Sequence, residues 1–313
     1  MKVRQFPKKK LLLVLPLLVI GALLPFFVSS YYADLVIQMF IFSIFAMSLN
    51  ILVGYTGLAS MGHAAYFGAA AYTTAFLFLA GIKSFWLVVV GGIVIVGLMA
   101  ALFGLLAVRA HGPYFMIITV SLSQVLWGIA FKWRSITGGD DGLPGIRRPD
   151  IGVGISVTPD LHFYYFIFVM FLLIFLVIYV LVNSPFGYSL RGIRESESRM
   201  KALGYNVWLY KYTAFVLAGA LAGVSGVLWV YYCGYVNPSD TGIDLSVKGL
   251  LMLILGGSGS LFGPAVGAGI IVLLQNVVSS LTSRWSLVLG IVYVAAVMLF
   301  SEGVFSIVKR HKN

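Results

Sequence analysis

Apolar residues occupy this chain in long runs, and polar residues are confined to short segments between them. A helix that crosses a bilayer needs about 20 mostly apolar residues, because about 30 Å of hydrocarbon is crossed at 1.5 Å per residue. Such runs are found at 11–28, 34–53, 64–82, 85–108, 113–131, 161–183, 212–235 and 286–301. The stretch 246–281 has room for two more helices if each is short or broken at its glycines. The pattern predicts an all-α, polytopic integral membrane protein with 8–10 transmembrane helices.

Basic residues indicate which ends of these runs face the cytoplasm, because Lys and Arg are enriched in cytoplasmic loops. In a ten-helix arrangement that starts in the cytoplasm, the cytoplasmic segments hold 14 Lys and Arg against 3 Glu. The outer segments, in which we count Lys83 and Lys248, hold 7 Lys and Arg against 7 Asp. Both termini are therefore expected in the cytoplasm. An odd number of spans would place the basic tail 309–313 outside, so an even number is expected. Ten spans are favoured over eight, with the short first half of 246–281 counted as a span.

The chain is expected to form one transmembrane domain at 11–308, preceded by a basic cytoplasmic N-terminus at 1–10. The run 11–28 is longer than the apolar part of a secretory signal, which has about 7 to 15 residues, so we expect it to remain as a first helix. Two loops interrupt the domain, an outer one at 132–160 and a cytoplasmic one at 184–211. Glycines and a proline in the outer loop predict a region of shaped turns.

Composition excludes several classes of protein. With 60% hydrophobic and only 10% charged residues, the chain lacks the charged surface of a water-soluble domain. The net charge of +11 does not point to nucleic acid, because the basic residues are dispersed among the loops between spans. The single cysteine, Cys233, cannot form a disulfide within the chain. Because the sequence has no zinc-binding His-Glu-x-x-His and no nucleotide-binding glycine loop, we expect no bound cofactor, and any ATP would bind another chain.

Glycines form two clusters, at 54–72 and 256–269. Small residues let transmembrane helices approach closely, and that explains most individual glycines. For these two clusters we favour a second interpretation, in which short or broken helices in the two halves of the chain expose backbone groups along a solute path. The candidates for the path are Asn50, Gly54, Tyr55, Thr56, Gly57, Ser60, Gly62, His63, Tyr66, Ser121, Gln124, Gly256, Gly257 and Gly259.

Polar groups within the spans are few, and each is costly enough in lipid that it is expected to face protein or water. No carboxylate lies at the centre of an expected span, which argues against a proton-coupled carrier. The lone His63 is expected to form a hydrogen bond between helices rather than to bind a metal or a proton.

The loop at 184–211 is the most hydrophilic interior stretch. Good helix formers run from Glu195 to Leu203 and stop at Gly204, which predicts a short helix with a glycine C-cap. With Met200 and Leu203 on one side, this helix is suited to lie on the membrane or to dock a partner.

Four stretches of the sequence resemble those of a known protein family. The segment ESESRMKALGYNVWLYK at 195–211 resembles the coupling loop of ABC importer permeases, specifically the LivM-type permeases of the branched-chain amino acid family. The stretches NILVGYTGLASMGHAAYFG at 50–68, GPYFMIIT at 112–119 with TGGDDGLPGI at 137–146, and LGGSGSLFGP at 255–264 are similar to that family in the same order. The similarity extends from about residue 35 to residue 305.

The resemblance implies a heteromeric importer in a bacterial or archaeal plasma membrane. Its other members would be a LivH-type permease, two ATP-binding subunits that carry ATP and Mg²⁺, and an extracytoplasmic solute-binding protein. This chain would be a transport subunit and not an enzyme. The residues that would couple it to an ATPase are Arg194, Glu195, Glu197, Arg199, Leu203, Gly204, Asn206 and Lys211.

The sequence leaves the solute open. A branched-chain amino acid is favoured by the frequency of such importers in the family, but the hydroxyls and glycines of the path would also suit urea or a short amide. A stand-alone channel or secondary carrier is the main competing class, and it would move solute without ATP. A membrane-embedded enzyme is disfavoured because paired carboxylates and metal ligands are missing.

Overall fold

We examined the chain in a computed structural model. The structure describes residues 21–149, 157 and 160–281, together with positions 284, 287, 288, 290, 291, 294 and 298. Both basic ends, most of the expected first span and most of the expected last span lie outside the described residues.

The described chain is almost wholly helical, which confirms the all-α prediction. Helices and strands follow in the order α2 (Ser30–Asn50), η1 (Ile51–Thr56, a π-helix), α3 (Ala64–Leu79), α4 (Phe85–Ala107), α5 (Pro113–Lys132), α6 (Arg134–Thr137), η2 (Gly139–Asp141), β1 (Leu143–Pro144), α7 (Asp160–Val182), α8 (Pro185–Glu195), α9 (Glu197–Ala202), α10 (Val207–Cys233), β2 (Tyr235–Val236), η3 (Pro238–Thr241), α11 (Ile243–Gly256) and α12 (Gly263–Leu281).

Six helices among the described residues are long and apolar enough to cross a membrane: α2 with η1, α4, α5, α7, α10 and α12. The apolar helix α3 has 16 residues and is shorter than a full span. The stretch 246–281 does divide at its glycines, because α11 ends at Gly256 and α12 begins at Gly263. The total of ten spans stays a prediction, since both ends of the chain lie outside the described residues.

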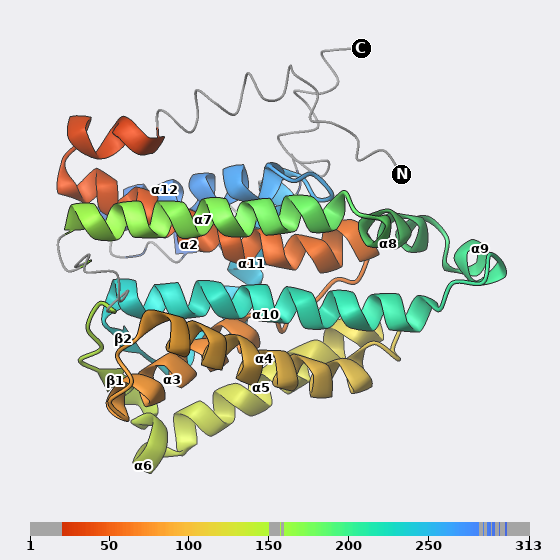
Figure 1. Ribbon diagram of the computed structural model, residues 1–313, viewed down its shortest axis with the longest axis horizontal. Coiled ribbons are helices and arrows are strands. Elements are labelled where there is room, and N and C mark those ends of the chain that lie inside the picture. Colours follow the sequence, from red (N-terminus) through yellow and green to blue (C-terminus); the bar gives the residue numbers. More distant parts are fainter. Residues whose placement is uncertain are drawn as a thin grey trace.

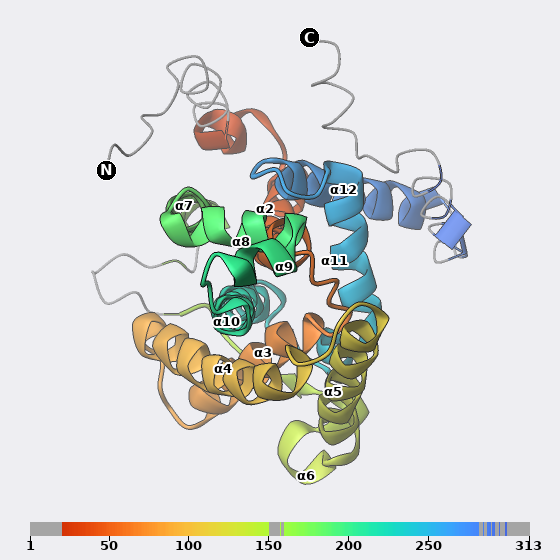
Figure 2. The same ribbon diagram turned by 90° about the vertical axis from the view of Figure 1, so that its right-hand side faces the viewer.

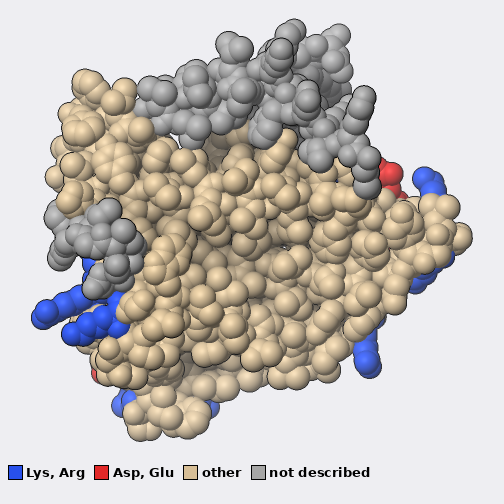
Figure 3. All heavy atoms as spheres, viewed as in Figure 1, with Lys and Arg blue, Asp and Glu red and all other residues tan. Residues whose placement is uncertain are grey.

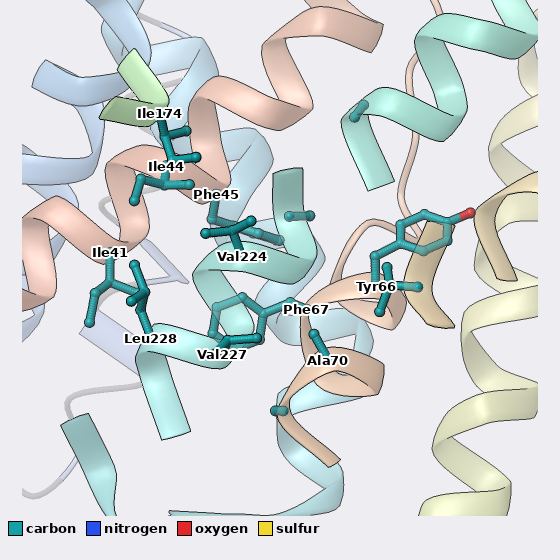
Figure 4. Close-up of a cluster of buried hydrophobic side chains, with 14 of the residues drawn as sticks. Ile41, Ile44, Phe45, Tyr66, Phe67, Ala70, Ile174, Val224, Val227 and Leu228 are labelled. Carbon is teal, nitrogen blue, oxygen red and sulfur yellow. The ribbon is translucent and has the colours of Figure 1, made fainter. Parts of the chain in front are cut away.

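The long helices pack around α2 and α10 (Figures 1 and 2). Helix α10 contacts α2, α3 and α4, whereas α2 contacts α7, α10, α11 and α12. The core between α2, α3 and α10 includes Phe45, Phe67 and Val227, which lie side by side in Figure 4. A side chain at Gly226 would overlap the carbonyl of Phe67, so this glycine allows α10 to approach α3 closely.

The surface has the distribution expected of a protein in a bilayer. On the face shown in Figure 3, Lys and Arg side chains lie at two opposite ends, and no charged side chain is visible in the described band between them. Leu87, Leu98 and Leu106 on α4 are exposed within this band, along the length of one helix. Exposed leucines along a spanning helix fit contact with lipid.

The outer loop folds over one end of the bundle. Strand β1 pairs with β2 in an antiparallel ladder in which Leu143 lies opposite Val236. Gly142 adopts a φ of 68°, and a side chain there would overlap the carbonyl of Val236. The described part of the loop therefore follows a defined course fixed by backbone contacts.

Candidate coupling and translocation sites

The polar loop after α7 contains two short helices at one end of the molecule, and α9 projects beyond the long helices (Figure 1). The helix expected from Glu195 begins two residues later, at Glu197, because Ser196 interrupts it. Ser196 is extended (φ −161°), and its hydroxyl accepts a hydrogen bond of 3.3 Å from the backbone N–H of Arg199. Serine favours such N-caps, so the chain makes a corner between α8 and α9.

The end of α9 confirms the predicted glycine cap. Gly204 has a φ of +85°, and its N–H donates to the carbonyl of Lys201 at 3.0 Å. The N–H of Tyr205 donates to the carbonyl of Met200 at 3.1 Å. These two bonds form a Schellman motif. The motif leaves Leu203 two-thirds exposed at the tip of the projection, with Arg199 also exposed.

Two polar contacts fasten this projection to α10. Lys211 is only 4% exposed and forms an ion pair with Glu197 at the start of α9. Asn206 caps α10 by accepting a hydrogen bond of 3.1 Å from the N–H of Leu209. The projection and α10 are therefore expected to move together.

Helix α8 contacts η1, the π-helical continuation of α2. Arg194 donates a hydrogen bond from Nη1 to the carbonyl of Gly54. The guanidinium of Arg191 lies 5.0 Å from the centre of the Tyr55 ring, close enough for a cation–π contact. A π-helix leaves backbone groups less regularly paired than an α-helix and is frequent at functional sites.

The two glycine clusters meet at the same place. Asn50 donates from Nδ2 to the carbonyl of Ser260 at 2.7 Å, and its Oδ1 accepts from the N–H of Gly259 at 2.9 Å. A side chain at Gly54 would lie 2.5 Å from the nitrogen of Gly259. We call Asn50, Gly54, Arg194, Gly259 and Ser260 the glycine junction.

A second meeting of helices lies two residues before Asn50 on α2, at Ser48. Ser48 donates to the carbonyl of Phe45 at 2.7 Å, so its oxygen is left to accept from Nε2 of His63 at 2.9 Å. This assignment makes Nδ1 of His63 an acceptor, and it has no hydrogen-bond partner among the described residues. The N–H of Ala64, at the start of α3, donates to the hydroxyl of Ser246 near the start of α11 at 2.9 Å. We call Ser48, His63, Ala64 and Ser246, together with Lys248 two positions after Ser246 on α11, the central junction.

His63 is wholly buried and bonds across to α2, which confirms the expected interhelical hydrogen bond. Ser60 is also wholly buried, and its hydroxyl has no partner among the described residues. Two buried, unpaired polar atoms in so short a stretch are unusual, because a buried polar group without a partner costs roughly 1–3 kcal/mol.

The remaining path candidates are dispersed. Thr56 donates to the carbonyl of Leu52 within its own turn, and Tyr66 packs edge-on against Phe215 at 5.7 Å. Tyr55 and Gly57 contact the arginines of α8, Gly62 lies against Thr119, and Gly256 and Gly257 lie in the turn before α12. Ser121 is exposed on α5, and Gln124 on the same helix is half-buried. Whether any of them contacts a solute stays a prediction.

Lys248 is the residue that sequence reasoning missed. Its assignment to an outer segment is wrong, because it lies within α11, with its ammonium 4.0 Å from the centre of the Phe42 ring on α2. The signal was present in the sequence, since Lys248 lies inside the apolar stretch 246–281. No carboxylate of the described residues forms an ion pair with it.

The aromatic group beside Lys248 continues to an acid. Trp229 on α10 lies 5.0 Å from Phe42, and its indole N–H donates to Asp240 of η3 at 3.1 Å. Asp240 also accepts a bond of 3.1 Å from the N–H of Asn237. Burial outweighs both bonds and raises the pKa of Asp240 to about 6. Among the described residues, no group of three His, Cys, Asp or Glu side chains could hold a metal ion.

The family described as "Branched-chain amino acid transport system / permease component" matches residues 31–298. This chain belongs to that permease family. The match covers both glycine clusters, the α8–α9 projection and Lys248. The permease is therefore a multi-pass membrane protein with the role of a transport component.

Curated relatives of the permease are similar over most or half of its length. It is 29% identical over 309 residues to the high-affinity branched-chain amino acid transport system permease protein LivM of Escherichia coli, covering 90% of this chain and 72% of that one. It is 26% identical over 184 residues to the autoinducer 2 import system permease protein LsrC of Salmonella typhimurium, covering 56% of this chain and 50% of that one.

A solved structure is similar in fold to the permease. The inward-facing structure of a proposed metal-chelate type ABC transporter aligns with a TM-score of 0.50 and 17% sequence identity, covering 97% of this chain and 99% of that one. At this identity the likeness concerns the fold alone. The arrangement of helices is thus one that ABC transporters use.

Proposed function

We propose that this permease is one of two membrane subunits of an ABC importer that moves branched-chain amino acids, or a closely related small amino acid or amide, into the cell. Similarity to LivM over 90% of the chain supports this solute class. The observation that carries the mechanism is the bond from Arg194 on α8 to the carbonyl of Gly54, which joins the polar projection to the two interrupted helices.

The expected complex contains a LivH-type permease, two ATP-binding subunits and an extracytoplasmic solute-binding protein. ATP and Mg²⁺ would bind the ATPase subunits. The complex would lie in a bacterial or archaeal plasma membrane with both termini of this chain in the cytoplasm. The charge distribution supports that orientation, because it places the α8–α9 projection on the cytoplasmic side.

The α9 projection would seat in a groove of one ATPase subunit. Its exposed Leu203 and Arg199 supply an apolar and a basic contact, and the Glu197–Lys211 pair holds it against α10. When the ATPase dimer closes, α8 would be displaced, and Arg194 would carry the displacement to the glycine junction. There α2, α11 and α12 meet, so a small shift can alter the packing of three helices in an alternating-access cycle.

Alternatives differ in solute or in energy source. The relatives named above are described with different solutes, so the family alone leaves room for urea or a short amide. A stand-alone channel or secondary carrier would need no projection held by a buried ion pair, and it would move solute without ATP.

The test is uptake by the whole complex. The subunits, co-expressed and purified, are reconstituted in liposomes with the binding protein, and ATP-dependent uptake of labelled leucine is measured with urea as competitor. Glu197→Lys should abolish uptake, because it sets a second cation beside buried Lys211 and releases α9. Gly204→Trp should do the same by placing a bulky group on the docking surface.

A matched control is Lys83→Glu, which also reverses a charge but lies exposed before α4. It should leave uptake unchanged, and all three variants should reach the membrane at equal levels. Normal uptake in both projection variants would exclude the coupling role. Flux without ATP would indicate a channel or carrier, and competition by urea would indicate an amide importer.

A further inference from the structure

Lys248 lies beside the middle of a spanning helix. Phe42, whose ring its ammonium faces at 4.0 Å, is near the middle of the 27-residue span Ser30–Thr56. Helix α11 packs against α2 along this part of the span. The depth of the ammonium is therefore fixed by the helix that it touches, about midway between the charged ends of the molecule.

A cation at this depth in a membrane has a high cost in free energy. Insertion of a lysine at the centre of a spanning helix costs at least about 2.5–3.5 kcal/mol. A cation–π contact offsets roughly 0.5–2 kcal/mol of this, and no carboxylate of the described residues lies within ion-pair distance of Lys248. Ionisable groups inside membranes generally pair with one another or mark the path of a solute. Because the described chain supplies no ion pair, an anion from outside the chain can act as the partner of Lys248.

The surroundings of Lys248 favour an anion further. Ser246 lies two residues before Lys248 on α11. Its hydroxyl accepts a hydrogen bond from the N–H of Ala64, so the starts of α3 and α11 adjoin. Both helices are shorter than a full span, with 16 and 14 residues, and the starts of such helices carry partial positive charge at membrane depth.

The same place offers an apolar wall. Phe42 packs with Trp229, and Leu245, one turn before Lys248 on α11, packs against the same cluster. Lys248 as a residue is partly exposed within the described chain. A cation set against aromatic and aliphatic groups suits a small solute that carries one carboxylate and an apolar body.

We propose that Lys248 binds the carboxylate of the transported solute at the centre of the membrane, with Phe42, Trp229 and Leu245 against the solute's apolar part. This inference rests on the proposed importer function and sharpens it, because urea and neutral amides have no carboxylate for Lys248. Lys248 would thus decide between the two solute classes that the sequence leaves open.

The first experiment is leucine uptake by the reconstituted complex with the binding protein and ATP. Lys248→Met keeps the aliphatic bulk and removes the charge, and it should lower uptake at subsaturating leucine by about 10- to 100-fold, the loss expected for one hydrogen bond to a charged group. Lys248→Arg should retain much of the activity. Lys83→Met, which removes an exposed lysine, is the matched control and should transport normally.

The second experiment asks whether the position lines an aqueous path, and it does not depend on ATP. Lys248→Cys is placed in a Cys233→Ala background and exposed to a cationic aminoethyl methanethiosulfonate. The thiol should be labelled, leucine-loaded binding protein with ATP should slow the labelling, and the attached aminoethyl group should restore part of the uptake. The anionic sulfonatoethyl reagent should label without restoring uptake.

The outcomes separate this inference from the proposed function. If the wild type imports leucine and Lys248→Met does so with the same rate and KM, the inference is wrong and the importer stands. If the wild type imports urea but no leucine, the inference is wrong and the importer carries an amide. A position 248 thiol that no water-soluble reagent reaches in any state would overturn the site, whatever the solute. If the Lys248→Met variant fails to assemble, the Lys248→Arg variant and the labelling of the position 248 thiol test the inference in its place.

Discussion

The glycine junction and the central junction are both places where interrupted helices meet, but they differ in how many of their polar groups have a hydrogen-bond partner. At the glycine junction every polar side chain is paired, since Asn50 makes two hydrogen bonds and Arg194 a third. At the central junction Lys248 has only an aromatic ring, and Nδ1 of His63 has no partner among the described residues. A fully paired joint transmits displacement as a rigid contact, whereas unpaired groups retain their capacity to bind.

The largest effect is expected at the glycine junction from Gly54→Ala. The new methyl group would overlap the Asn50 side chain and lie 2.5 Å from the backbone nitrogen of Gly259, so two chain segments would have to separate. We expect loss of assembled complex, measured by size-exclusion chromatography of membrane extracts. Gly97→Ala is the control, because nothing lies within 4 Å of a side chain there. Equal assembly of the two variants would show that the junction is loose.

Asn50→Ala tests the hydrogen bonds without adding bulk. It leaves the N–H of Gly259 and the carbonyl of Ser260 unpaired, which is expected to lower the free energy of unfolding by about 2–4 kcal/mol. Denaturant titration in detergent measures the loss. Asn276→Ala removes one bond within α12 and should cost less than about 1 kcal/mol. Similar losses in both would mean that Asn50 does not join the helices.

Ser48→Ala examines the paired side of the central junction. It removes the acceptor for Nε2 of His63 and leaves a buried donor unpaired, at an expected cost of about 1–3 kcal/mol in the same titration. Ser279→Ala, at an exposed site on α12, should change stability by less than about 0.5 kcal/mol. A Ser48 variant as stable as the wild type would indicate that His63 finds another acceptor.

The smallest effect is expected for Gly204→Ala, outside both junctions. The position has space for a methyl group, so the cost is that of the left-handed backbone, about 1 kcal/mol. Gly204→Asn should lose less, because asparagine tolerates this conformation. Thermal unfolding in detergent ranks the two variants. An alanine variant that loses more than Gly54→Ala would reverse the order of effects.

Some of these features follow from the sequence because their causes are local. The spans are set by run length against bilayer thickness, and the breaks at Gly257 and Gly204 follow from backbone conformations that glycine adopts most easily. The start of α9 was misjudged by two residues, since the helix propensity of Glu195 gave no sign that Ser196 would cap a separate helix.

The sequence by itself thus determined that the chain is helical, lies in a membrane and carries a capped projection. Only the tertiary structure brought Gly54 to Arg194, 140 positions away, and Asn50 to Gly259, 209 positions away. It also moved Lys248 from an expected loop to the middle of the bundle, beside Phe42. The reason is physical: helix length and capping depend on neighbours in the chain, whereas pairing across the bundle depends on how whole helices pack.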